Sequence, residues 1–194
     1  MSEIARVIRA DVRSFDCAYP RYTSRPHALG QMLAVREGHY VTFGVVAGSE
    51  SGPEDPSRPL APRGKPGQSA AAVMAENPEI AMLLRTELTV VICGHIDREV
   101  SRALLPPQPP PLLAEVQPAT DDEKLRIGAD GGFLVPLVAT RDADDAVLAA
   151  AIRDVARAFG PDAGEFTISA GKELARLLKA EPSRLTSILR AVEQ

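Results

Sequence analysis

Hydrophobic residues follow two different spacings along this chain, and the change between them divides it into two parts. Over roughly the first 140 residues, short apolar runs are separated by turn residues, which is typical of β-strands. The clearest runs are YVTFGVVA and LTVVICGHI, which are rich in β-branched residues. The runs that we expect to form strands are 4–12, 29–35, 40–47, 88–96, 112–116 and 133–139. Pro136 would place the last of them at a sheet edge or a bulge.

After Asp142 the spacing changes to that of a helix. Leu148, Ile152, Val155 and Phe159 recur every three or four residues, so they share one helix face. Two more amphipathic stretches follow, and we expect three short helices over residues 141–194. The two parts together predict an α+β fold, in which a small antiparallel β-barrel over residues 1–140 is followed by a short C-terminal α-helical region.

Two proline-rich segments interrupt the predicted barrel. Residues 48–69 combine Pro, Gly, Ser and charges, and we expect a long disordered loop there because little apolar surface is available to offset its ordering entropy. Residues 70–76 and 78–85 follow as two short helical pieces. Residues 106–111 (PPQPPP) predict a rigid crossover between strands, since proline cannot donate a ladder hydrogen bond. The same segment could alternatively be a polyproline ligand for an aromatic-lined groove.

Composition narrows the classes of function. Hydrophobic residues make up 45% of the chain and charged residues 25%, as in ordinary globular proteins. Aromatic residues are scarce at 4% and the net charge is −4, which disfavours a base-stacking channel and a wholly basic DNA-binding surface. Two distant cysteines, a charged N-terminus and short apolar runs predict a reduced cytoplasmic protein that does not enter the membrane.

Motifs for nucleotide chemistry are weak. The Gly-Lys pairs at 64–65 and 171–172 lack the upstream glycine and the following Ser or Thr of a phosphate-binding loop. The acidic cluster Asp142, Asp144 and Asp145 lies at a predicted helix start, where capping is its simplest role. We therefore expect neither an enzyme nor a bound cofactor.

A metal site is one further possibility. Cys93 and His95 are two residues apart, and on a regular strand both would project to the same side. His27, His39 or Cys17 could complete a ligand set. The simpler alternative is that Cys93 is a small core residue and His95 a hydrogen-bonded polar residue at the end of its strand.

A nucleic-acid contact is the other possibility. Two short amphipathic helices joined by Ala180-Glu181-Pro182 have the spacing of a helix-turn-helix. Cations on such helices contact phosphates and bases, although a charged stripe opposite a leucine face is also what any solvated helix shows. The candidate residues are Lys172, Arg176, Lys179, Arg184 and Arg190.

The first 140 residues also resemble the HAS-barrel family, a small β-barrel shared by HerA-type DNA-processing ATPases and rotary ATP synthase subunits. The resemblance is carried by GQMLAVREGHYVTFGVVAGSES and by TVVICGHIDREVSRALLPPQPPPLLAEVQPA. In that family the barrel is an assembly element, and the ATPase core that usually follows it is replaced here by about fifty helical residues. The resemblance therefore implies a freestanding, non-enzymatic assembly or interaction module, whose partner is a HerA-like ATPase or another copy of itself.

Overall fold

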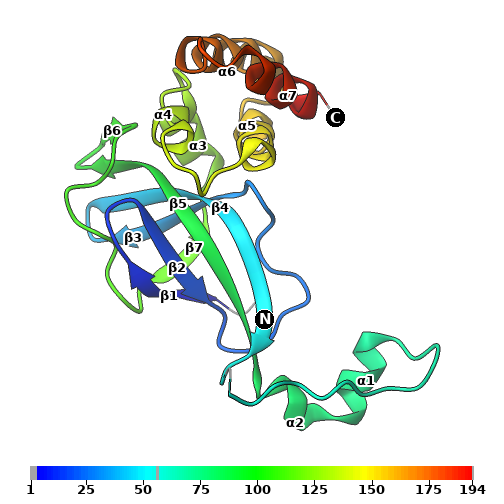
Figure 1. The fold of residues 1–194 in the computed structure, drawn as a ribbon. Helices are drawn as coiled ribbons and strands as arrows, with labels where there is room; N and C mark the ends of the chain where they lie inside the picture. Colours follow the sequence, from blue (N-terminus) through cyan, green and yellow to red (C-terminus); the bar gives the residue numbers. More distant parts are fainter. Residues whose placement is uncertain (1–3, 56, 194) are drawn as a thin grey trace.

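The protein is a closed β-barrel that carries a layer of helices on one side and a long two-stranded arm at the far end (Figure 1). The computed structural model describes residues 4–55 and 57–193. Across these residues the strands pair antiparallel in the closed order β1-β2-β5-β4-β3-β7. The short strand β6 pairs with the C-terminal end of β5, beyond the part that pairs with β2. The strands are β1 (Ala5–Ala10), β2 (Ser14–Ala18), β3 (Met32–Glu37), β4 (Tyr40–Pro53), β5 (Leu84–Asp97), β6 (Val100–Arg102) and β7 (Glu115–Pro118).

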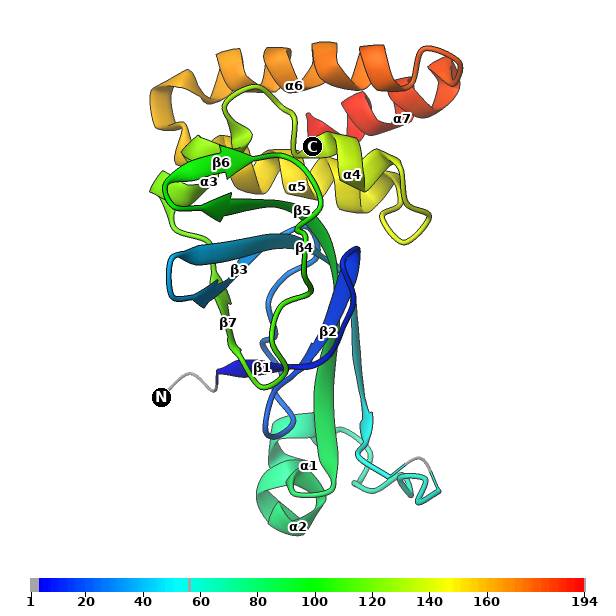
Figure 2. The same ribbon diagram turned by 90° about the vertical axis from the view of Figure 1, so that its left-hand side faces the viewer.

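The helices belong to two groups at opposite ends of the molecule (Figures 1 and 2). The first group lies at the tip of the arm and consists of α1 (Ala70–Glu76) and α2 (Pro78–Ala81). The second group packs on the barrel and consists of α3 (Asp121–Gly128), α4 (Leu134–Val138), α5 (Asp145–Ala158), the 3₁₀ turn η1 (Gly160–Asp162), α6 (Ala163–Leu177) and α7 (Pro182–Val192). We call this second group the helical layer.

Strands β3, β4 and β5 are buried on both of their faces. Along β3, Leu33 and Val35 point into the barrel, while Met32 and Ala34 point out and pack beneath the helical layer. The same alternation on β4 and β5 supplies residues to both cores. Burial on two faces explains why these strands read as nearly continuous apolar runs rather than as a strict alternation of apolar and polar residues.

A buried carboxylate joins the helical layer to the barrel. Asp154 of α5 is almost fully buried, and its Oδ2 accepts a hydrogen bond of 2.9 Å from the backbone N–H of Met32. The ammonium group of Lys124, on α3, lies 2.9 Å from the same oxygen. One carboxylate therefore connects the start of β3, α3 and α5, and its bonds to Met32 and Lys124 hold these elements in fixed positions.

Close approach of α5 to the barrel requires a glycine beside this carboxylate. Gly30 has a φ of +77°, and a Cβ placed on it would lie 2.2 Å from the Cβ of Ala150. Only glycine tolerates both the left-handed backbone and the missing space. The chain can therefore turn into β3 directly beneath α5.

A second ion pair fastens α3 to the rim of the barrel. Nε of Arg36, on β3, donates to Glu123 at 2.9 Å, and Glu123 also caps α3 by accepting a hydrogen bond from the Thr120 N–H at 2.7 Å. Burial acts to raise the pKa of Glu123, but the hydrogen bonds from Arg36 and Thr120 outweigh it and hold that pKa below its ordinary value.

The predicted fold class is confirmed: a small antiparallel β-barrel precedes the C-terminal helices. The three helices expected after residue 140 are α5, α6 and α7, and the two short pieces expected near residue 75 are α1 and α2. No helix in the described part of the chain has the length and apolar character needed to cross a membrane.

The strand predicted over residues 133–139 is wrong, because Leu134–Val138 form α4. Pro136 is compatible with a helix here since it lies in the first turn, where its missing N–H has no helical partner to lose. Leu134 and Leu137 are three residues apart and both are buried. The change from strands to helices accordingly comes after Pro118 rather than at residue 140, and the acidic run 121–123 is the first turn of α3.

Two strand segments in the N-terminal half were not predicted from the sequence. Residues 14–18 form β2 and close the barrel by pairing with β5. Residues 48–53, expected to belong to a disordered loop, continue β4. Their small polar side chains gave no apolar alternation from which a strand could be predicted.

We expect Asp154→Ala to lower the free energy of unfolding by about 3–5 kcal/mol, because it leaves the buried Lys124 ammonium and the Met32 N–H without their acceptor. Urea denaturation followed by circular dichroism measures the effect. Asp162→Ala, at an exposed aspartate, is the matched control and should change stability little. A loss of less than about 1 kcal/mol for Asp154→Ala would contradict the role given to this carboxylate.

The lowered pKa of Glu123 predicts an acid-sensitive contribution to stability. The folded-state pKa lies below the unfolded value of about 4.3, so the contribution is complete above that pH and is lost as pH falls through the folded pKa. Glu123→Gln keeps a side chain that can cap α3 but removes the charge. The variant should be less stable than the wild type at pH 7, and the difference should shrink as pH falls below about 4.3. A stability difference that does not change with pH would show that the charge of Glu123 contributes nothing.

Candidate functional site

Exposed apolar side chains are found at the tip of the arm, which we define as residues 49–86. Here β4 and β5 continue past the barrel as a two-stranded ribbon, paired from Ser49–Leu88 to Pro53–Leu84, and α1 and α2 lie at its end (Figure 2). The helical layer covers the other end of the barrel, so the arm extends away from both cores.

Apolar side chains surround a hollow near the tip of the arm. The hollow has a volume of about 420 Å³, and Pro59, Leu60, Ile80 and Leu83 are among its lining residues. Leu60 is 48% exposed and Leu83 54% exposed, and the neighbouring Met82 is 69% exposed. Apolar residues gathered around a concavity are typical of a surface that binds another molecule.

Sequence reasoning missed this surface because the residues that form it lie in a stretch rich in Pro, Gly and Ser. Leu60 and the pair Met82-Leu83 are more than twenty positions apart in the chain, and only the folded ribbon brings them to one end. The alternation in LRTEL, residues 84–88, was the one local signal that β5 begins before residue 88.

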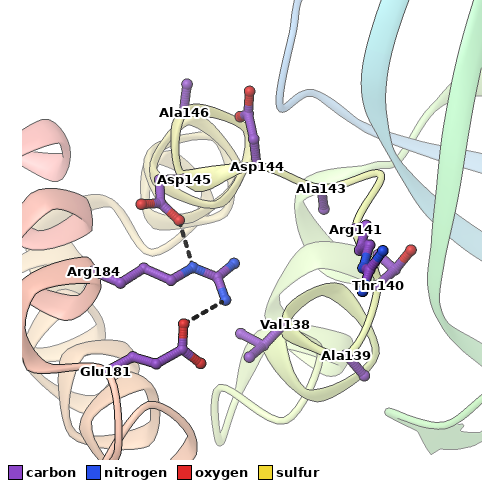
Figure 3. Close-up of a pocket in the computed structure, with 10 residues that line it drawn as sticks. All are labelled: Val138, Ala139, Thr140, Arg141, Ala143, Asp144, Asp145, Ala146, Glu181 and Arg184. Carbon is purple, nitrogen blue, oxygen red and sulfur yellow. Dashed lines mark hydrogen bonds and ion pairs between the residues drawn. The ribbon is translucent and has the colours of Figure 1, made fainter.

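A second hollow, of about 580 Å³, lies between the α4–α5 connection and α7 (Figure 3). Nε of Arg184 donates to Asp145 at 2.7 Å, and its Nη1 lies 3.6 Å from Glu181. The hydrogen bond with Asp145 is the largest cause of the raised pKa of Arg184. Asp144 caps α5 by accepting from the Val147 N–H. The acidic cluster at this helix start therefore caps α5 and holds α7.

Two of the five basic residues predicted to contact nucleic acid form ion pairs within the protein. Lys172 and Arg176 on α6, and Lys179 in the turn after it, are exposed, but Arg176 forms a two-point ion pair with Glu173, and this hydrogen bonding raises the pKa of Arg176. Arg184 is held by Asp145 and Glu181. Of the five candidates, Lys172, Lys179 and Arg190 are exposed and form no ion pair with a described residue.

The proposed metal pair is separated by a β-bulge. Phe43 pairs with Gly94 and Gly44 with Ile92, so Cys93 has no partner on β4. The bulge leaves Cys93 in the core beneath the helical layer, whereas His95 lies on the other face of β5 and stacks on Tyr40. The expectation that Cys93 and His95 project to the same side is therefore wrong.

The other suggested metal ligands are also dispersed. Cys17 is buried inside the barrel, His27 lies beside Tyr19, and His39 lies 3.5 Å from Asp97. Among residues 4–55 and 57–193, no three His, Cys, Asp or Glu residues come together in a way that could hold a metal ion.

The proline segment 106–111 lies across one opening of the barrel. Pro106 and Pro110 are buried, and a small hollow of about 160 Å³ separates the segment from Tyr40 and Thr42. Nδ1 of His95 lies 3.0 Å from the Leu104 oxygen, which fixes the start of the segment. The segment connects β6 to β7, as expected for a crossover.

Both thiols should be unreactive in the folded protein. Burial raises the pKa of Cys93 to about 12, and burial together with the Asp16 carboxylate raises the pKa of Cys17 to about 12. Because the thiolate is the reactive and metal-binding form, we expect a disulfide reagent such as Ellman's reagent to label neither cysteine at pH 8 without denaturant, and both in urea. Rapid labelling of one thiol in the native protein would contradict this arrangement.

No protein-family model matches this chain, and no curated protein matches it either. The resemblance to the HAS-barrel family consequently stands on the residues quoted above. The structure adds a closed six-stranded barrel, an architecture that many unrelated families share, so membership of the HAS-barrel family stays a prediction.

Proposed function

We propose that this chain is a non-enzymatic assembly module that binds a protein partner through the tip of its arm. The observation that supports the proposal is the exposed apolar group Leu60, Met82 and Leu83 beside a hollow of about 420 Å³. These residues lie in the loop and the turn at the end of the arm, and none of them belongs to either core. Their exposure costs free energy unless another surface covers them.

The resemblance gives the class of partner. In the HAS-barrel family the barrel is a unit of assembly, so a HerA-type ATPase is the first partner to test. Self-association is the other outcome of the same experiment.

The nucleic-acid alternative is less well supported by the structure. Two of its five candidate cations, Arg176 and Arg184, already pair with carboxylates. A surface that binds phosphates leaves its cations available to replace counterions. Binding of duplex DNA at low salt, lost when Lys172 and Lys179 are changed to Glu, would restore this alternative.

Substitution of the arm tip tests the proposal. We expect the triple variant Leu60→Ser, Met82→Ser and Leu83→Ser to keep the thermal midpoint of the wild type within a few degrees, since these residues are outside both cores. Binding to a HerA-type ATPase, measured by isothermal titration calorimetry, should weaken by at least about tenfold, because truncation of apolar anchors removes about 1–2 kcal/mol or more.

Ile168→Ser is the matched control, because Ile168 is 63% exposed but lies on α6 in the helical layer. It should leave binding unchanged. Equal binding by the triple variant and the wild type would place the interface elsewhere. Absence of both ATPase binding and self-association, measured by light scattering, would refute the proposal.

A further inference from the structure

One edge of the arm carries unpaired backbone. The pairing of β4 with β3 ends at Val45–Met32, and the N–H and oxygen of Val46 bond to Gln31 and Gly30. Beyond Val46, no backbone hydrogen bond links this edge of β4 to another segment within the described residues. Unpaired edge groups of this kind are a template for an added strand.

The direction of the free groups follows from the strand geometry. The Glu54 N–H donates to the Leu83 oxygen at 2.8 Å, which points it toward β5. Alternation along a regular strand then directs the N–H groups of Ser49 and Ser51 away from β5, on the free edge. Pro53, which has no N–H, falls at an outward position as well, where its loss breaks no bond to β5.

Small side chains leave this edge accessible. Residues 48–52 are Gly, Ser, Glu, Ser and Gly, and Ser49, Glu50 and Ser51 are exposed. A hollow of about 400 Å³ lies on the ribbon face that carries Glu50, Gly52 and Glu54, and it is also lined by Leu60 and by Arg85 and Glu87 of β5. An added strand would therefore find a place for a side chain next to its backbone contacts.

The charge at this edge is negative, and some of its carboxylates have no cationic partner. Three arginines nearby are each paired with a carboxylate: Arg58 with Asp55 at 3.5 Å, Arg63 with Glu79 at 3.6 Å, and Arg85 with Glu87 at 2.5 Å. Glu50 and Glu54 form no ion pair with any described residue. Two carboxylates thus remain to attract cations on an incoming strand.

The same charges disfavour pairing between two copies of this edge. Residues 47–57 contain Glu50, Glu54 and Asp55 and no Lys or Arg. Antiparallel pairing of two such segments would bring like charges together, which destabilises a sheet. The edge is therefore suited to a strand of different, basic composition.

We propose that the free edge of β4, from Ala47 to Pro53, binds an extended segment of a partner protein by strand addition. The segment carries Lys or Arg at two positions four residues apart, facing Glu50 and Glu54, and an apolar residue midway between them, on the same face, that enters the hollow beside Leu60. This inference rests on the proposed function and deepens it, since it gives the chemistry of the partner segment that the arm binds.

The experiment uses the full chain and a fluorescent octapeptide of sequence Thr-Lys-Thr-Leu-Thr-Lys-Thr-Thr, which places two Lys and the Leu between them on one strand face, with binding followed by fluorescence anisotropy. A peptide with Glu in place of each Lys tests the charge, and one with alternate backbone amides N-methylated tests the strand pairing. The wild-type protein should bind the first peptide, and each of the other two at least about tenfold more weakly.

Protein variants test the same site from the other side. Glu50→Lys with Glu54→Lys should reduce binding of the Lys peptide by at least about tenfold, whereas Glu76→Lys with Glu165→Lys changes the net charge equally at exposed positions away from the edge and should retain most of the affinity. Ser49→Pro should weaken binding because it removes an edge N–H, and Ser49→Ala should not.

Equal binding of the N-methylated peptide, or equal loss in both double variants, would overturn the proposal, since neither backbone pairing nor the two carboxylates would then matter. If the Lys peptide does not bind while the arm-tip triple variant still loses the ATPase, strand addition is wrong and the proposed function stands. If the triple variant also retains the ATPase, both are wrong.

Discussion

The carboxylate of Asp154 is the contact on which the arrangement of this molecule depends. It receives the backbone N–H of Met32 from the barrel and the ammonium of Lys124 from α3, in a nearly dry environment. A buried carboxylate bonded to donors from two other elements defines one position for each of them, because an alternative packing would leave a charge unpaired. Gly30 allows α5 to come close enough for this contact to form.

The helical layer packs on β3, β4 and β5, and its position determines which surfaces of the molecule stay exposed. One end of the barrel is covered by helices, and one opening is crossed by the proline segment 106–111. The arm lies outside both cores and keeps exposed apolar groups at its tip and unpaired backbone along β4. The barrel and the helical layer thus hold the arm where another protein can reach it, and this arrangement supports the proposed assembly role.

Much of the fold follows from local patterns. Apolar runs predicted the central strands, and the spacing of Leu148, Ile152 and Val155 predicted α5, because both elements bury a regular face. The prediction failed where tertiary contacts overrode the local pattern. α4 contains a proline that suggested a strand edge, and the arm half of β4 is a strand without apolar residues, stabilised by its ladder with β5.

The candidate sites were harder to predict than the fold. A single bulged residue at Cys93 reverses the side on which His95 lies, and no sequence pattern announces it. The contact between Asp154 and Met32 joins residues 122 positions apart, so only the folded chain shows it. Arg176 and Arg184 look like free cations in the sequence, but their carboxylate partners neutralise them.

Hydrogen–deuterium exchange of the full chain, with and without a HerA-type ATPase, shows directly whether the arm is the binding surface. We expect slowed exchange on binding to be confined to the arm, with β4 from Ser49 to Pro53 and the segment around Met82 showing the largest change. The barrel and the helical layer should exchange as they do in the free protein. Protection centred on α6 and α7 with an unchanged arm, or no change anywhere, would contradict it.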